Sequence, residues 1–99
     1  MNREEIKACL VETIAEIQAG GGLYCPSLEG GSTPARDVPE FTSEVGIAAT
    51  TILSQRIGIA IPVETNLFYN KEKGQETTID QIIESLVSIQ DSLDEESSE

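Results

Sequence analysis

Residues 41–62 constrain the fold most, because they have the pattern of one amphipathic helix with both ends marked. Thr42 or Ser43 can cap its first turn, since a side-chain oxygen there accepts a hydrogen bond from an otherwise unpaired backbone N–H. Gly58 can adopt the left-handed conformation that closes a helix. The apolar residues that recur at helical spacing, and so predict its buried face, are Val45, Ala49, Ile52, Leu53 and Ile57. Such a helix must bury that face against other elements.

Two further segments have helical periodicity. In the first, Asn2 and Glu5 form a capping pair, and residues 20–22, all glycine, end the helix. Its apolar positions are Ile6, Leu10, Ile14 and Ile17. In the last, Thr78 and Gln81 form a capping box. Its apolar positions are Ile79, Ile82, Ile83, Leu86, Ile89 and Leu93.

The segments between these helices are predicted to be irregular. Residues 20–40 are rich in Gly, Pro, Ser and Thr, which predicts a long loop. Four apolar residues spaced through it are expected to pack over the helices: Leu23, Tyr24, Leu28 and Val38. Residues 59–62 form a short apolar crossover, residues 63–69 one irregular helical turn, and residues 70–76 a polar loop. No strand is predicted.

The predicted fold class is therefore all-α: a small three- to four-helix bundle with a long loop between the first and second helices. We expect one helical domain over residues 1–90. Residues 91–99 are expected to form an acidic, disordered tail, with residues 94–99 made only of acids and serine.

The charge of the chain limits its partners. Eighteen acidic residues against six basic ones give a formal net charge of −12. A nucleic-acid binder needs the opposite sign to release counterions from phosphates, so no nucleic-acid partner is expected. No apolar run approaches the ~20 residues of a membrane span, and no signal-peptide pattern opens the sequence. We expect a cytoplasmic protein without a membrane partner.

The sequence offers little material for catalysis or metal binding. It contains no histidine, the commonest general base and metal ligand. Its two cysteines, Cys9 and Cys25, imply neither a disulfide framework nor a zinc site. Cys25 is either a reactive loop thiol or a spectator. We expect no catalytic residue, no metal and no enzymatic activity; an enzyme with a Ser or Cys nucleophile is the remote alternative.

Three segments in order resemble the acyl carrier protein family, which also includes peptidyl carrier domains. They are Ser43 at a helix start, residues 58–62 with the sequence Gly-Ile-Ala-Ile-Pro, and residues 77–83, which begin Thr-Thr-Ile. The resemblance covers roughly residues 3–90. It implies that Ser43 carries a 4′-phosphopantetheine arm whose thiol holds acyl or aminoacyl groups as thioesters. The implied partners are a phosphopantetheinyl transferase and dedicated acyl- or aminoacyl-transferring enzymes of fatty acid or secondary metabolite biosynthesis, and we expect a monomer.

The chain departs from the family at the residues around the serine. Thr42 replaces the usual aspartate and Glu44 the usual leucine, so the motif is Thr-Ser-Glu instead of Asp-Ser-Leu. The face expected to be exposed is nearly uncharged: it carries Thr50, Thr51, Ser54, Gln55 and Arg56. Docking there would depend on shape and small apolar contacts. The predicted partner-binding residues are Thr42, Glu44, Ile47, Thr50, Thr51 and Ser54.

Three alternatives accompany this interpretation. Ser43 could be only a helix cap in an unmodified, carrier-like protein–protein interaction module. The cluster of Leu67, Phe68 and Tyr69 could line a groove for an acyl chain between helices or pack as a lid over the core. Ser92 lies in a literal Asp-Ser-Leu, but no helix with an apolar face follows it, so we reject it as an attachment site.

Overall fold

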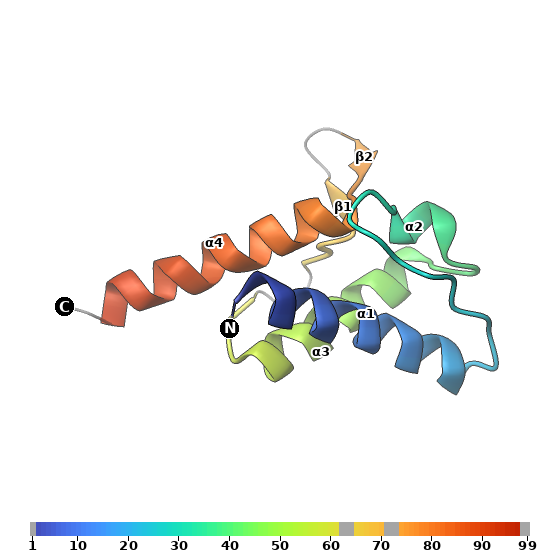
Figure 1. The fold of residues 1–99 in the computed structure, drawn as a ribbon, viewed down its shortest axis with the longest axis horizontal. Coiled ribbons are helices and arrows are strands. Elements are labelled where there is room, and N and C mark those ends of the chain that lie inside the picture. The colour runs from blue at the N-terminus through green and yellow to red at the C-terminus, as the bar shows by residue number, and fades with distance from the viewer. Residues whose placement is uncertain (1, 62–64, 71–73, 98–99) are drawn as a thin grey trace.

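The computed structural model describes residues 2–61, 65–70 and 74–97. Within these ranges the chain is mostly helical, with four helices and one antiparallel two-stranded sheet (Figure 1). The elements in order are α1 (Arg3–Gly20), α2 (Pro34–Asp37), α3 (Ser43–Ile57), β1 (Tyr69–Asn70), β2 (Gln75–Glu76) and α4 (Ile79–Ser97). The predicted all-α class holds for the helices and is wrong for the small sheet.

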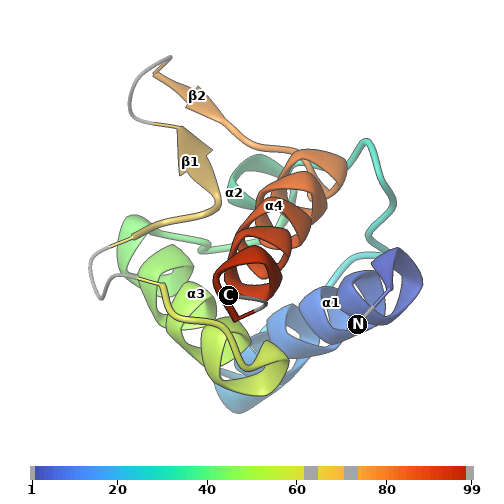
Figure 2. The ribbon, with the colours of Figure 1, turned by 90° about the vertical axis from the view of Figure 1, so that its left-hand side faces the viewer.

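The three long helices meet around one core. α1 packs against both α3 and α4, and Figure 2 shows the three helices around a common centre, with the sheet at one side. Residues from all three supply fully buried apolar side chains, among them Leu10, Leu53, Ile82 and Leu86. The predicted stripes of α1 and α4 are confirmed at these positions, although the side chain of Leu93 lies outside the described part of the chain. In α3, Ala49 and Leu53 are buried, and Val45, Ile52 and Ile57 are half-buried.

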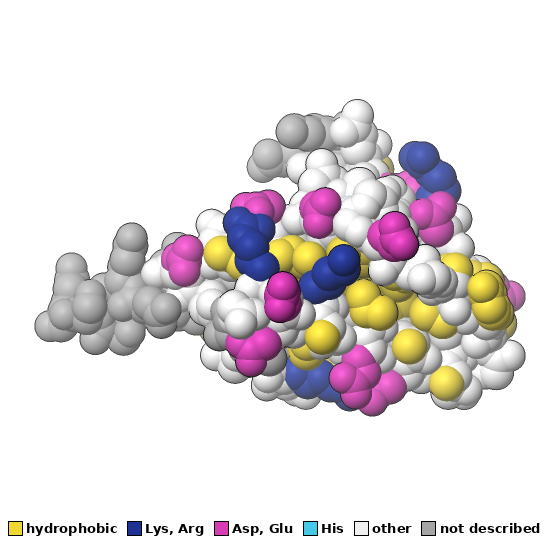
Figure 3. Space-filling model, in the orientation of Figure 1, with side chains coloured by type: hydrophobic (Ala, Val, Ile, Leu, Met, Phe, Trp, Pro, Cys, Tyr) yellow, Lys and Arg dark blue, Asp and Glu magenta, His cyan; other side chains and the backbone are white. Residues whose placement is uncertain are grey.

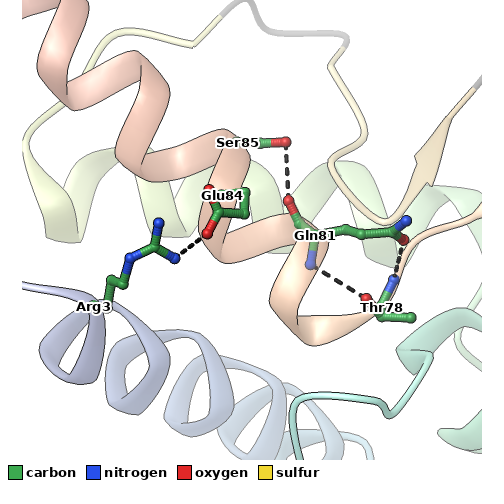
Figure 4. Close-up of polar contacts among 5 residues, drawn as sticks. All are labelled: Arg3, Thr78, Gln81, Glu84 and Ser85. Atoms are coloured by element: carbon green, nitrogen blue, oxygen red, sulfur yellow. Dashed lines mark hydrogen bonds and ion pairs between the residues drawn. The ribbon is translucent and has the colours of Figure 1, made fainter.

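The capping signals of the first and last helices are confirmed. Asn2 Oδ1 accepts from Glu5 N at 2.9 Å, while Glu5 Oε1 accepts from Asn2 N at 3.0 Å. At the start of α4, Gln81 N donates to Thr78 Oγ1 at 3.2 Å and Thr78 N donates to Gln81 Oε1 at 2.8 Å (Figure 4). Each box satisfies two N–H groups that have no partner inside the helix, so these short patterns fix where α1 and α4 begin.

Gly58 ends α3 as predicted. Its φ of 80° is left-handed, and Ser54 O accepts from the N–H groups of both Gly58 and Ile59. Glycine adopts this conformation without a steric penalty. The turn directs the buried side chain of Ile59 into the core.

Two ion pairs join α1 to the other long helices. The guanidinium of Arg3 binds Glu84 of α4 (Figure 4), and that of Arg56 in α3 binds Glu16. The hydrogen bond from Arg3 lowers the pKa of the Glu84 carboxyl, so the contribution of this pair to stability is present above the ordinary carboxyl pKa and is lost in acid. Both partners are exposed, so the effect is small.

The long loop packs over the helices, as predicted, with corrections. Leu28 and Val38 are buried, whereas Tyr24 is 72% exposed and is no anchor. The loop also contains α2, a four-residue helix too short to give a periodic sequence pattern. Its proline stands at the first helical position, where no N–H is needed.

The backbone of the loop is held at both sides. The buried side chain of Gln18 donates to Tyr24 O at 3.2 Å and to Pro39 O at 3.0 Å. On the α4 side, Ser32 O accepts from Ile79 N at 2.9 Å and Gly30 O accepts from Asp80 N at 3.0 Å. The loop therefore connects α1 with the start of α4.

Two regions after α3 differ from the expectation. Residues 66–69 form one hydrogen-bonded turn, in which Tyr69 N donates to Asn66 O at 3.4 Å, but no helix. They lead into β1, which pairs with β2 through Tyr69 opposite Glu76 and Asn70 opposite Gln75. Residues 63–64 of the predicted turn lie outside the described residues. The sequence predicts a disordered tail over residues 91–99, whereas α4 continues to Ser97. The acids there follow an established helix with no Gly or Pro to end it.

Candidate functional site

Ser43 is the first residue of α3, and its neighbour Thr42 is the cap. Thr42 has an extended backbone, and its Oγ1 accepts from Val45 N at 3.3 Å. Both residues are exposed. Of the two capping residues that the sequence leaves open, Thr42 is correct and Ser43 is wrong. No hydrogen bond of the Ser43 hydroxyl to another described residue is found, so this hydroxyl is available to solvent.

The first turn of α3 leaves backbone donors beside Ser43. Gly46 N donates to Thr42 O at 3.0 Å, and Val45 N is taken by the cap. The N–H groups of Ser43 and Glu44 precede these bonds and have no acceptor within the helix. Together with the helix dipole they favour an anion at this end. The carboxylate of Glu44, in the same turn, already makes use of that preference.

A small pocket of about 180 Å³ opens beside Ser43. α2, the start of α3 and the sheet surround it, and its lining residues are Ala35, Phe41, Thr42, Ser43, Asn66, Phe68, Tyr69 and Glu76. Glu76 Oε2 is buried and accepts no hydrogen bond from any described residue. It lies 3.5 Å from Arg36 Nε of α2, which makes an ion pair with it. The fold thus brings a carboxylate from β2 into the pocket that Ser43 lines.

The predicted partner-binding residues do not all lie on one exposed surface. Thr50 is only 1% exposed: its hydroxyl donates to Gly46 O at 2.8 Å and accepts from Leu67 N at 3.1 Å. It holds the chain after α3 against the helix and cannot face a partner, so that prediction is wrong. Of the others, Thr42, Glu44 and Thr51 are exposed, and Ile47 and Ser54 are half-buried.

Arg56 also differs from the surface role expected for it. Besides pairing with Glu16, it donates to the buried Thr13 Oγ1 at 3.0 Å. The hydrogen bond that Arg56 donates to Glu16 raises the pKa of Arg56 further above its ordinary value. Arg56 therefore joins α3 to α1.

Sequence reasoning missed two polar residues of the pocket, Asn66 and Glu76. Asn66 Oδ1 accepts from Phe68 N at 2.9 Å, a bond from an Asn side chain to the backbone two residues on, which is a known turn preference of asparagine and could have been noticed. Glu76 has no comparable local signal, because only the pairing of β1 with β2 brings it near Ser43. Of the aromatic cluster, Phe68 packs in the core and Tyr69 is partly exposed at the pocket.

The described residues give no indication of a metal site or of a membrane-spanning helix. Among the described residues, no three His, Cys, Asp or Glu side chains are grouped to hold a metal ion. No helix in the described ranges is both long and apolar enough to span a membrane.

Comparison with known proteins adds no relative. No family model, no curated protein and no solved structure matches the chain. The carrier resemblance therefore remains a prediction from the sequence.

The assignment of the cap can be tested by stability. Thr42→Ala should lower the free energy of unfolding by about 1 kcal/mol, because Val45 N loses its acceptor. Ser43→Ala should change it by less than about 0.5 kcal/mol, since this side chain is exposed. Urea denaturation followed by circular dichroism measures both. An equal or larger loss for Ser43→Ala would assign the cap to Ser43.

Proposed function

We propose that this protein is a specialised cytoplasmic carrier protein with a carrier-like helical bundle. It would present acyl or aminoacyl thioesters, held on a 4′-phosphopantetheine arm at Ser43, to dedicated partner enzymes. The observation that carries the proposal is the state of Ser43: an exposed hydroxyl at the first position of α3, relieved of capping by Thr42. A serine in that position can react without loss of the helix end.

The surroundings of Ser43 fit a phosphodiester in part. The N–H groups of Ser43 and Glu44 have no acceptor in the helix and lie at the positive end of its dipole. The carboxylates of Glu44 and Glu76 oppose a second negative charge there, and Arg36 offsets Glu76 through their ion pair. The arm supplies a thiol that forms thioesters; the protein supplies the anchor and the docking surface.

Glu76 supplies an acidic group to the pocket beside Ser43, whose motif lacks the aspartate of the family. The chain has Thr42 at the position where the family has aspartate. Glu76 nevertheless contributes a carboxylate to the same pocket as Ser43. A transferase that requires an acid near the serine would find one there, supplied by β2.

The test is the intact mass after incubation with coenzyme A and several phosphopantetheinyl transferases. In that reaction the Ser43 oxygen forms a bond to the phosphorus that carries pantetheine, and adenosine bisphosphate leaves. We expect a single addition in the natural protein, none in Ser43→Ala, and an unchanged addition in Ser92→Ala. Ser92 is the matched control, because it stands in the literal Asp-Ser-Leu.

An unmodified mass with every transferase would contradict the proposal. The variant Thr42→Asp/Glu44→Leu, which restores Asp-Ser-Leu around Ser43, then identifies the cause. If only this variant is modified, the fold is that of a carrier, and the natural protein is the unmodified interaction module of the alternative hypothesis. That module would not use Ser43 as its cap, since Thr42 has this role.

A further inference from the structure

A second and larger pocket, of about 500 Å³, lies between the end of α1 and the start of α3. Ile17, Leu23 and Val45 supply apolar side chains to its wall. Its volume is in the range of small-molecule sites, which are mostly apolar with a few placed polar groups. Figure 3 shows hydrophobic side chains exposed over the C-terminal part of α1 and the loop after it, while charged side chains lie mostly elsewhere on this face.

The wall of this pocket is held in place by Gln18. Its side chain is only 1% exposed, and its amide donates to the carbonyl oxygens of Tyr24 and Pro39. These two carbonyls belong to the beginning and the end of the long loop. The buried amide therefore fixes both loop ends against α1, and the pocket is formed before any ligand binds.

Glu40 is the charged residue of the pocket wall. It is exposed and has a φ of 55°, and it is the one non-glycine residue with positive φ in the described ranges. Strained backbone of this kind is concentrated at functional sites. Among the described residues, no lysine or arginine lines the pocket, and none of them neutralises the Glu40 carboxylate there. A ligand that is apolar and carries one positive charge complements this wall.

Thr42 connects the pocket with Ser43. It lines both the 500 Å³ pocket and the 180 Å³ pocket, and Ser43 is the next residue. A phosphopantetheine arm on the Ser43 oxygen is therefore attached next to both pockets, and the arm must fold back along α3 to bring the group at its end into the larger one.

We infer that the larger pocket receives the carried group, and that this group is aminoacyl with an apolar side chain. The inference rests on the proposed carrier function. The side chain of the amino acid contacts Ile17, Leu23 and Val45, and its ammonium group faces Glu40. A simple fatty acyl group forms no ion pair with the Glu40 carboxylate, which makes it the poorer ligand.

The test uses two free amides that differ only in the amino group: leucinamide and 4-methylpentanamide. Each is titrated into the full-length, ¹⁵N-labelled protein at about pH 6.5, where the amine is protonated. We expect saturable shifts of the amide signals of Gly21, Leu23 and Val45 with both ligands. Leucinamide should bind about two- to fivefold more tightly, which is the strength of a partly exposed ion pair.

The variant Glu40→Gln should bring leucinamide down to the affinity of the neutral amide. Glu12→Gln is the matched control, because it removes the same charge from an exposed residue of α1 that does not line the pocket; it should leave the difference unchanged. Equal affinity of the two amides, or no saturable shift at these three residues, would overturn the inference. Neither ligand requires a modified Ser43, so a failure of the carrier proposal shows separately, as an unmodified mass.

Discussion

Phe68→Ala should lower the free energy of unfolding by about 3–5 kcal/mol, the usual cost of removing a buried aromatic side chain. Phe68 is 1% exposed and its ring packs against that of Phe41, with centroids 4.9 Å apart and planes inclined by 59°. The variant loses this ring contact and leaves a cavity where α3 meets the chain before the sheet. Domains of this size have about 5–15 kcal/mol of stability, so the midpoint of urea denaturation should fall sharply.

Tyr24→Ala is the control for this prediction. It removes a side chain of similar size from a position that is 72% exposed, so the cost should stay within about 0.5 kcal/mol. If Phe68→Ala cost no more than Tyr24→Ala, Phe68 would not be part of the core, and the alternative in which residues 67–69 line a groove would return.

Gly46→Ala should destabilise the protein by about 1–3 kcal/mol, the range for overpacking a tight site. In an exposed helix the same change would stabilise by about 1 kcal/mol, because alanine is the better helix former. Here a Cβ at position 46 would lie 2.5 Å from Asn66 Oδ1 and 2.8 Å from Asn66 Nδ2. Asn66 cannot move away without loss of its bond from Phe68 N. A loss of stability in Gly46→Ala would therefore show that residues 66–68 pack closely on α3, and a gain would show that they do not.

The double variant Gly46→Ala/Asn66→Ala separates overlap from other effects. With the short side chain at position 66, the methyl group introduced at position 46 has room, so the double variant should lose less stability than the sum of the two single variants. Gly20→Ala is the control: no atom lies within 4 Å of its Cβ and it is exposed at the end of α1. Additive losses in the double variant would mean that the introduced methyl group does not meet Asn66.

The helix ends were the part of the fold that the sequence predicted best. Asn2, Gly58 and Thr78 act through bonds to residues a few positions away, so their patterns are complete in a short window of sequence. The same locality allowed the position of Ser43 at a helix start to be predicted, although not the division of roles between Ser43 and Thr42.

Thr50 shows why the site was predicted only in part. Its polarity and its place on α3 indicated an exposed docking residue. It is buried because Leu67, seventeen positions later, donates to its hydroxyl from a segment laid across the helix. Glu76 enters the Ser43 pocket through strand pairing in the same way. Contacts of this kind leave no periodic signal, and neither does a four-residue helix such as α2.

The hydrogen bonds between the long loop and α4 have a consequence for how the protein is made. Gly30 and Ser32 find their donors at Asp80 and Ile79, near the other end of the chain. On a ribosome, α1 and α3 emerge before those donors exist. The hydrogen bonds of Gly30 and Ser32 can therefore form only after Asp80 has left the exit tunnel, so the middle of the long loop is completed late, although it is synthesised early.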